Sequence, residues 1–351
     1  NLAHVSRVTA AYVRDPVPAN LVSFPPLDDG WFPGSWRDSR AGYAGGRYAM
    51  DVNAIWAPRA LAAVAEIRDR LLALGLDADA WAAAAPRALD GPLGTYLRNP
   101  AALDSAIRTW RGAGRHFRVA FAPAEIRRHV EAYLAWLPPE EARYWRRVLA
   151  RTRADRDTLR FLALSLDEQG RPIPVANTDP ATAVALAGGA ADARAPADPT
   201  RVLAEIEVIL RPYPVGLFVA GLGPVAANDA YADPDTWERY RRDTYHSPRV
   251  VWGREVNLLL FGLAQEIERA AAAHGQPPTP DAARRLRALR AALDSVRTAV
   301  AASGLEHQEL WSYEIENGTL RPVRYGTSTD VQLWNLTDLA VEYLVNRLPN
   351  P

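Results

Sequence analysis

Capped helical segments recur along this chain, and the clearest lies between Thr279 and Gly304. Thr279 and Pro280 form a typical helix start, because threonine can cap a first turn and proline is tolerated at the first helical position. Leucine and valine residues then follow at helical spacing, and Gly304 stands where a helix stop is expected. The segment is predicted to form a long amphipathic helix. Four of its arginines (Arg284, Arg285, Arg287 and Arg290) are expected to form a solvated face.

Similar patterns predict that helices dominate the rest of the chain. Four helices are predicted over Asp51–Gly75, Glu141–Leu149, Val250–Ala270 and Val331–Val345. Two more are predicted to begin at Asn99-Pro100 and at Pro123. The segment Val250–Ala270 is apolar enough to be buried on most sides. Asp51 is expected to cap the helix that follows it.

Two segments are expected to depart from the helical pattern. Residues 1–31 contain four prolines, which favour extended backbone and predict no long helix there. The stretch Phe161–Leu186 contains turn signals between short apolar runs, so it is predicted to be a strand-like hairpin. We divide the chain into residues 1–50, an extended segment with a loop, and residues 51–351, a helical domain.

Composition limits the partners that the protein is expected to have. The chain has 351 residues, 48% of them hydrophobic, and 41 basic residues balance 41 acidic ones. With no net charge we expect neither nucleic acid nor an anionic membrane as a partner. No apolar run is long enough to span a bilayer, and no signal peptide is visible. The absence of lysine and the abundance of arginine, alanine and proline indicate a bacterial protein, in the cytoplasm or the periplasm.

Chemistry that depends on cysteine is excluded, because the chain contains no cysteine. The six histidines lack metal-ligand spacing, and no Gly-rich phosphate loop is present. We therefore expect no metal and no cofactor.

The stretch Gly34–Pro58 stands out as a place to bind a polar ligand. It is rich in glycine and arginine, carries Trp36, Asp38, Arg40 and Arg47, and leads directly into a predicted helix. A carboxylate between a tryptophan and arginines is rarely a core residue. An ion pair of Asp38 with Arg37 or Arg40 is the structural alternative.

Trp36-Arg37-Asp38-Ser39, a Gly-rich spacer and the helix near Asp51 together resemble the acid-bearing loop of the six-hairpin glycosidase superfamily, which includes trehalases and glycogen-debranching glucosidases. The resemblance implies an all-α fold, an (α/α)6 toroid of helical hairpins that is complete or interrupted. It also implies that Asp38 is the general acid. Burial against Trp31 and Trp36 would then raise the pKa of that carboxyl.

The second block that resembles this superfamily is Tyr245–Asn257. Its Tyr245, His246 and Trp252 offer hydrogen bonds and a stacking face for a sugar ring. A structural histidine and a core tryptophan are the alternative.

The third block, Leu305–Asn335, resembles the segment in which glucoamylase-like enzymes carry the catalytic base. Glu309, two residues before Trp311, is the first choice, and Glu306 and Asp330 are rivals. The structural alternative is that these acids pair with Arg321 and Arg324.

Further polar residues are candidates for binding sugar hydroxyls. They are Arg40, Arg47, Asn53, Asn177 and Asp179, with Trp311 as an additional stacking surface. Asn177 and Asp179, like Asn228 and Asp229, equally fit ordinary turn chemistry.

The function expected from these features is hydrolysis of a glucoside-type bond with inversion, with a carbohydrate as the partner. A phosphorylase that uses inorganic phosphate and a non-catalytic carbohydrate-binding protein are the alternatives. Because the superfamily has several helices before its acid loop, we also expect missing helices, in a longer chain or in a second one.

Overall fold

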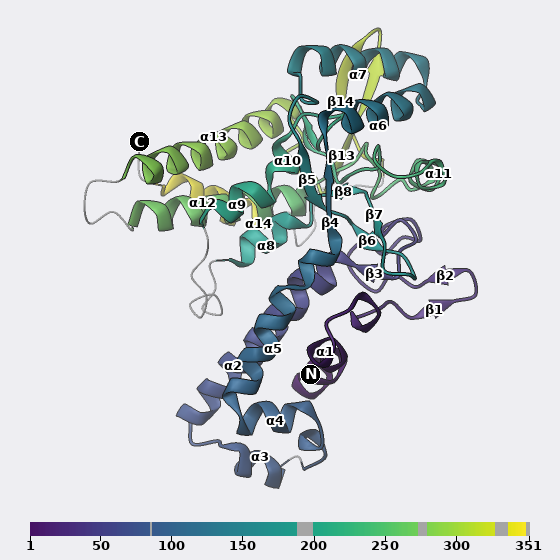
Figure 1. Ribbon diagram of the computed structural model, residues 1–351. Helices are drawn as coiled ribbons and strands as arrows, with labels where there is room; N and C mark the ends of the chain where they lie inside the picture. Colours follow the sequence, from purple (N-terminus) through teal and green to yellow (C-terminus); the bar gives the residue numbers. More distant parts are fainter. Residues whose placement is uncertain (85, 188–198, 273–278, 327–335, 349–351) are drawn as a thin grey trace. The chain divides into compact units, whose positions relative to one another are not determined.

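The computed structural model describes most of the chain and is mostly helical (Figure 1). In the described part there are fourteen α-helices and six small sheets of two or three strands. This agrees with the prediction of a helical fold with short strands. The described residues are 1–84, 86–187, 199–272, 279–326 and 336–348.

The chain contacts divide it into two compact units. Among the described residues, unit 1 comprises 1–118 and 162–173, and unit 2 comprises 119–161, 174–187 and those from 199 onward. The division at residue 50 that the sequence indicated therefore falls inside unit 1.

Unit 1 is built mainly from helices, of which α2 packs against α5 and α1 against α4. Its helices are α1 (Leu2–Arg14), α2 (Ala57–Ala73), α3 (Ala78–Ala84), α4 (Pro92–Arg98) and α5 (Pro100–Arg111), and its strands are β1 (Pro26–Leu27), β2 (Gly30–Trp31), β3 (Tyr48–Ala49), β6 (Ser165–Leu166) and β7 (Pro172–Ile173). Asn99 caps α5 as predicted, since its side chain accepts a hydrogen bond from the Ala102 amide.

Helix α1 corrects the prediction that residues 1–31 contain no long helix. The first proline is at position 16, so nothing interrupts the backbone between residues 2 and 14. Thr9 and Tyr12 are buried on one face of this helix. The Trp110 indole donates to the Thr9 carbonyl at 3.1 Å, which attaches α1 to α5.

The segment that starts at Asp51 is helical, but it begins with a π-helical turn at Asp51–Trp56 before α2. The expected cap at Asp51 was wrong. Its buried carboxylate instead accepts hydrogen bonds from the Ser35 hydroxyl at 2.7 Å and the Tyr43 hydroxyl at 3.1 Å. The predicted stop at Gly75 is confirmed by its positive φ of 78°.

The predicted hairpin in Phe161–Leu186 is confirmed only for its first half. Strands β6 and β7 pair in antiparallel fashion, and β3 completes their sheet. Residues 180–186 form helix α8 instead of a strand, because Pro180 at its start favours a first helical turn and alanines follow.

Unit 2 contains the larger hydrophobic core. Its helices are α6 (Pro123–Trp136), α7 (Pro139–Thr152), α8 (Pro180–Leu186), α9 (Pro199–Glu205), α10 (Glu207–Leu210), α11 (Pro234–Arg242), α12 (Gly253–Ala272), α13 (Pro280–Ser303) and α14 (Leu336–Asn346). Its strands are β8 (Ala176–Asn177), β9 (Phe218–Val219), β10 (Gly223–Pro224), β11 (Ala227–Asn228), β12 (Val251–Trp252), β13 (Leu310–Glu316) and β14 (Thr319–Arg324). Strand β4 (Arg118–Phe121) pairs with β5 (Leu159–Leu162).

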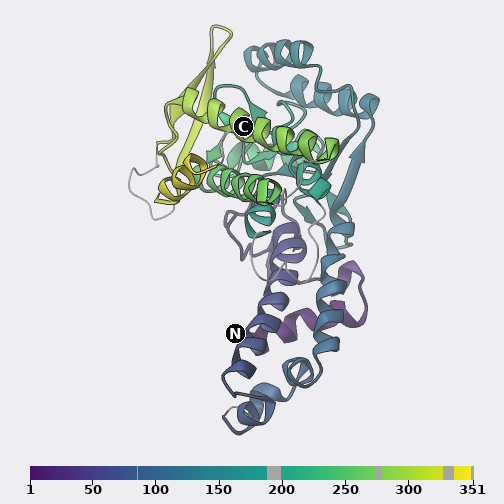
Figure 2. The same cartoon turned by 90° about the vertical axis from the view of Figure 1, so that its left-hand side faces the viewer.

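Helix α12 is the central helix of this core and packs against α8, α13 and α14. It is buried on most sides, as predicted. Figure 2 shows α12 and α13 side by side. Gly262 permits the closest approach to α8, since a Cβ there would lie 2.7 Å from Val184 Cγ1 and 2.8 Å from the Ala185 nitrogen.

Helix α13 confirms the strongest sequence pattern. The Thr279 side chain accepts from the Ala282 amide, and Gly304 has a positive φ of 64°. The expectation of four solvated arginines was too broad. Arg285 is mostly buried and pairs with the buried Glu266 of α12 at 3.4 Å.

The hairpin of β13 and β14 inside the third block was not predicted from the sequence. Asn317 and Gly318 both have positive φ angles, 51° and 72°, as a two-residue hairpin turn requires. Strand β12 pairs with β13, with Trp252 opposite Leu310. The second and third blocks therefore lie next to each other in one sheet.

Candidate functional site

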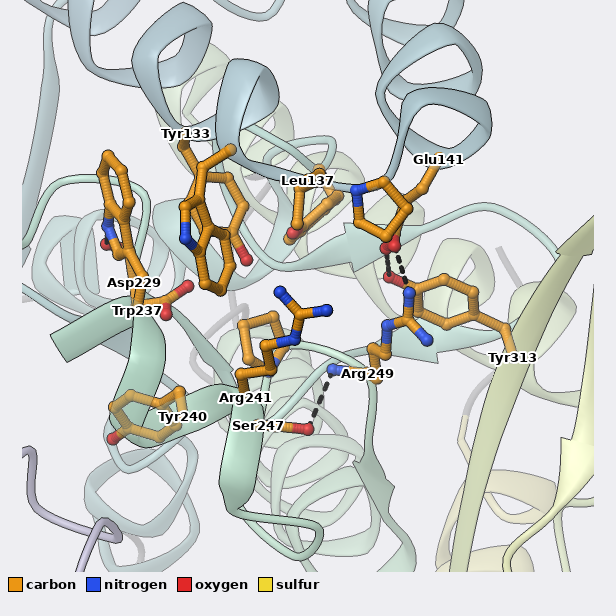
Figure 3. Close-up of a pocket in the computed structure, with 14 residues that line it drawn as sticks. Tyr133, Leu137, Glu141, Asp229, Trp237, Tyr240, Arg241, Ser247, Arg249 and Tyr313 are labelled. Atoms are coloured by element: carbon orange, nitrogen blue, oxygen red, sulfur yellow. Dashed lines mark hydrogen bonds and ion pairs between the residues drawn. The ribbon is translucent and has the colours of Figure 1, made fainter. Parts of the chain in front are cut away.

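Unit 2 contains a pocket of about 300 Å³, at the small end of the range for ligand sites. Figure 3 shows its lining side chains. They come from α6, α7, α11, β13 and four loops, and they are Tyr133, Trp136, Leu137, Pro138, Glu141, Tyr213, Asp229, Trp237, Tyr240, Arg241, Ser247, Pro248, Arg249 and Tyr313.

Aromatic rings from α6 and α11 form one wall of the pocket. The ring centroid of Trp237 lies 5.4 Å from that of Tyr133 and 5.8 Å from that of Trp136. Tyr133 and Trp237 are buried, whereas Trp136 is partly exposed. Mutual packing fixes these rings, and such a wall suits a ligand with an apolar face and polar edges.

Asp229 is held at the pocket by a network around the end of β11. The Asn228 side chain donates to the carbonyls of Pro214 and Gly216, both at 2.9 Å, which fixes the loop. The Trp237 indole donates to the Asp229 carbonyl at 2.9 Å. The backbone of Asp229 is therefore rigid, and its buried side chain lines the pocket.

Burial raises the pKa of Asp229 to about 7, and a hydrogen bond from the Tyr133 hydroxyl acts in the opposite direction. Tyr133 is in turn hydrogen-bonded to Tyr213. Burial first, and then the nearby carboxylates, raise the pKa of Tyr213 well above its ordinary value, so this phenol stays protonated. One carboxylate oxygen of Asp229 (Oδ1) is buried without a hydrogen-bond partner among the described residues. Asp229 is thus a carboxyl that still carries a proton near neutral pH.

Glu141 is the second carboxylate of the pocket, and its environment differs. It lies in the first turn of α7, where the helix dipole favours negative charge. Arg249 forms an ion pair with its Oε2 atom, and the Tyr313 hydroxyl donates to Oε1 at 3.5 Å (Figure 3). Glu141 is buried, and Arg249 is half exposed. The positive charge of Arg249 compensates the negative charge of Glu141.

Arg241 supplies an additional positive charge. Its guanidinium lies over the Trp136 ring, 5.4 Å from the centroid, and points into the pocket in Figure 3. Within the described ranges it forms no ion pair with a carboxylate. The pocket therefore combines a protonated acid, an ionised carboxylate with its arginine, and a second arginine.

This arrangement can perform general acid catalysis. A carboxyl with a pKa near 7 can donate a proton and be reprotonated at neutral pH, and an ionised carboxylate can activate water. The environments of Asp229 and Glu141 separate the two roles.

The predicted acid, Asp38, lies in unit 1 and is exposed. The expected burial against tryptophans is therefore not found. The face of Trp36 is covered by the Arg37 guanidinium, 4.2 Å from the ring centroid, and that of Trp31 by Arg47 at 4.7 Å.

The other predicted site residues of unit 1 have structural partners. Arg40 is exposed and forms two hydrogen bonds to Asp29, at 2.8 and 3.0 Å. Arg47 lies between Trp31 and Tyr48. The buried Asn53 exchanges two hydrogen bonds with the backbone of Val22, at 2.8 and 2.9 Å, and so anchors that loop.

Tyr245, His246 and Trp252 lie close together in unit 2 but do not line the pocket. His246 is buried, stacks on Trp252 with ring centroids 5.8 Å apart, and lies 3.2 Å from an Asp243 oxygen. The Trp252 indole donates to the Tyr245 carbonyl at 2.7 Å. The block reaches the pocket instead through its next residues, Ser247 to Arg249.

The acids proposed as the base also lie outside the pocket lining, as far as the structure describes them. Glu309 is buried and Glu306 is partly buried, while Asp330 falls outside the described residues. Arg321 pairs with Glu314 at 2.5 Å. Trp311 belongs to the core, where its indole donates to the Leu222 carbonyl at 3.0 Å.

Asn177 and Asp179 are buried in the turn between β8 and α8. The Asn177 side chain accepts from the Asp179 amide at 3.2 Å, which is ordinary turn chemistry. Neither residue lines the pocket.

The sequence analysis did not assign the residues that line this pocket to a site. Asp229 was named as a polar turn residue similar to Asn177 and Asp179, and Glu141 only as part of a helix start. Local patterns did not place the two together, because long-range packing makes them neighbours. Arg249 and Tyr313 do fall within the two blocks that were singled out. The two blocks lie close together because β12 pairs with β13. The sequence signal for part of this sheet was Asn317-Gly318, which is typical of a two-residue hairpin turn.

A comparison of the chain with protein-family models, with curated proteins and with solved structures found no match. Among the helices that the structure describes, none is long and apolar enough to cross a membrane. Over the same residues, no three histidine or acidic side chains are grouped to hold a metal ion.

Proposed function

We propose that the pocket of unit 2 is a carbohydrate site and that the protein is a glycoside hydrolase. The observation that carries the proposal is Asp229, a buried carboxyl with a pKa of about 7 in a pocket lined by aromatic rings. Aromatic faces stack on the C–H faces of sugars, and glycosidases need one carboxyl that is protonated at working pH.

In this proposal Asp229 gives its proton to the glycosidic oxygen as the bond to the anomeric carbon breaks. Glu141 takes a proton from a water molecule, whose oxygen bonds to that carbon. Asp229 is then reprotonated from solvent, and Glu141 releases its extra proton to solvent. The expected stereochemical course is inversion, in which the water attacks from the side opposite the leaving group.

The scaffold in this proposal is the toroid of helical hairpins that the resemblance implies. Its support within unit 2 is the pair α6 and α7, which contact each other and are separated only by Leu137 and Pro138. Short connections of this kind are typical of antiparallel helical hairpins.

The test compares Asp229→Asn with Asp38→Asn on a panel of α- and β-glycosides. Loss of general acid catalysis predicts that Asp229→Asn lowers kcat by roughly 10²- to 10⁴-fold. We expect Asp38→Asn to retain near-normal turnover. The opposite pattern would transfer the acid role to Asp38 and refute the assignment to Asp229.

A second candidate, a non-catalytic carbohydrate-binding protein, is favoured by the contacts of Glu141. Both of its oxygens are engaged, one by Arg249 and one by Tyr313. Saturable sugar binding with no product after long incubation with the same panel would support this candidate over the hydrolase.

A further inference from the structure

The charges in the pocket of unit 2 do not cancel. Glu141 and Arg249 neutralise each other as an ion pair. Asp229 is uncharged when protonated, and it forms no ion pair with a described residue. Arg241 then leaves one positive charge that no described carboxylate compensates.

Arg241 is placed to bind a ligand. Stacking on Trp136 orients its planar guanidinium, and in Figure 3 that group points between Asp229 on one side and Glu141 with Arg249 on the other. A guanidinium presents two parallel donors that match the oxygens of a carboxylate or a phosphate.

A second, independent observation points to a ligand at the same place. The Oδ1 atom of Asp229 is buried and has no hydrogen-bond partner among the described residues. Leaving such an atom without a partner is unfavourable, and a hydrogen bond from a ligand hydroxyl would remove that cost.

We propose that the pocket binds an acidic sugar, whose carboxylate or phosphate oxygens pair with Arg241 while a hydroxyl group hydrogen-bonds to Asp229. This proposal rests on the proposed function, because it takes the ligand to be a carbohydrate. It adds that the carbohydrate carries a negatively charged group. A neutral sugar would satisfy Asp229 and leave Arg241 without an anionic partner.

The protonation of Asp229 adds a pH dependence to this binding. As the pH rises through about 7, Asp229 becomes negative and the net positive charge of the pocket is lost. The other titratable or charged groups that face it are Tyr133 on α6, Glu141 on α7, Tyr240 and Arg241 on α11, and Tyr213, Arg249 and Tyr313. Burial raises the pKa of the Tyr133, Tyr213 and Tyr313 phenols, which therefore stay neutral, and Glu141 stays paired with Arg249. Affinity for a sugar carboxylate, whose own charge is constant over this range, should therefore fall between about pH 6 and pH 8.

The test measures binding of glucuronate, glucose 6-phosphate and glucose by calorimetry at pH 6. The two acids distinguish a carboxylate ligand from a phosphate ligand. Arg241→Gln removes the charge, and Arg241→Lys keeps it without the paired donors. Arg242→Gln is the matched control, because Arg242 is exposed, pairs with Glu238 at 3.1 Å and does not line the pocket.

We expect at least one acid to bind more tightly than glucose. Arg241→Gln should lower the affinity for that acid about tenfold or more, because it loses a charge-assisted hydrogen bond. Arg241→Lys should retain part of the affinity, and Arg242→Gln all of it. Three results would overturn the proposal: equal affinity for glucose and both acids, an unchanged affinity of Arg241→Gln for the acid, or no binding of either acid.

The two proposals fail separately. If neutral glycosides are hydrolysed through Asp229 and the acids bind no better than glucose, the anionic subsite is wrong and the hydrolase stands. If an acid binds through Arg241 and no glycoside is hydrolysed, the subsite stands and the hydrolase is wrong.

Discussion

Asp229 combines burial with a hydrogen-bond network, and this combination has a consequence for stability at the residue scale. Its pKa is about 7 in the folded protein, against about 4 in an unfolded chain. The folded state therefore binds more protons between these two values, and stability falls as the pH rises through this window.

We predict that Asp229→Asn removes this part of the pH dependence. Relative to the wild type, the variant should gain stability between pH 4 and pH 8, by up to about 4 kcal/mol for a shift of three pH units. Urea unfolding at several pH values measures the difference. Asp157→Asn, at an exposed position, is the control. Its free energy of unfolding should differ from that of the wild type by the same amount at every pH. A constant offset for Asp229→Asn as well would mean that the folded protein does not raise the pKa of Asp229.

Single residues were the hardest part of the candidate site to predict from the sequence. Asp38 stands beside Trp36, and that proximity indicated a buried acid, but burial depends on what packs over a loop. Asp229 and Glu141 are 88 positions apart, and they share a pocket because α6, α7 and β11 belong to one unit. No local sequence pattern predicts that these two residues lie in the same pocket.

At the scale of elements, the contact between α12 and α8 depends on Gly262. In an open helix, Gly→Ala would stabilise by about 1 kcal/mol. Here the added Cβ would meet Val184 and the backbone of Ala185 at less than 3 Å.

We therefore predict that Gly262→Ala destabilises the protein by about 1–3 kcal/mol, as overpacking does. Thermal or urea unfolding gives the comparison. Ala270→Gly, near the end of the same helix, is the control, and we expect it to cost about 1 kcal/mol from helix propensity alone. A Gly262→Ala variant more stable than the wild type would show that α12 and α8 are not in this close contact.

Helices were predicted well where caps and periodicity agree, as in α13 with Thr279 and Gly304, because these signals act within a few residues. The prediction failed for α1, where prolines after the helix were given too much weight. The hairpin of β13 and β14 was also missed, since Asn317-Gly318 was not interpreted as a turn signal. Local signals were present in both cases.

At the scale of the whole molecule, the balance of charge determines whether nucleic acid is expected as a partner. The 41 basic and 41 acidic residues leave no net field to attract a polyanion. We predict no gel shift with double-stranded DNA or RNA at about 0.15 M salt. A shift that weakens steeply with added salt would contradict the exclusion of nucleic acid as a partner.

The division into two units was not visible in the sequence, because each unit is assembled from separate stretches of the chain. Periodicity predicts helices, but it does not say which distant segment each helix contacts. The proposed site accordingly rests on contacts within unit 2 alone.

The central claim is that Asp229 is a proton donor in the pocket, and its titration tests this most directly. Carboxyl carbons are followed by ¹³C NMR against pH, with Asp229→Asn used to assign the signal. We predict a pKa of about 7 for Asp229. We also predict a higher pKa for Asp229 in Tyr133→Phe, because that variant loses the hydrogen bond that favours the ionised carboxylate. Titration near the ordinary aspartate value of about 3.9, with no response to Tyr133→Phe, would contradict it.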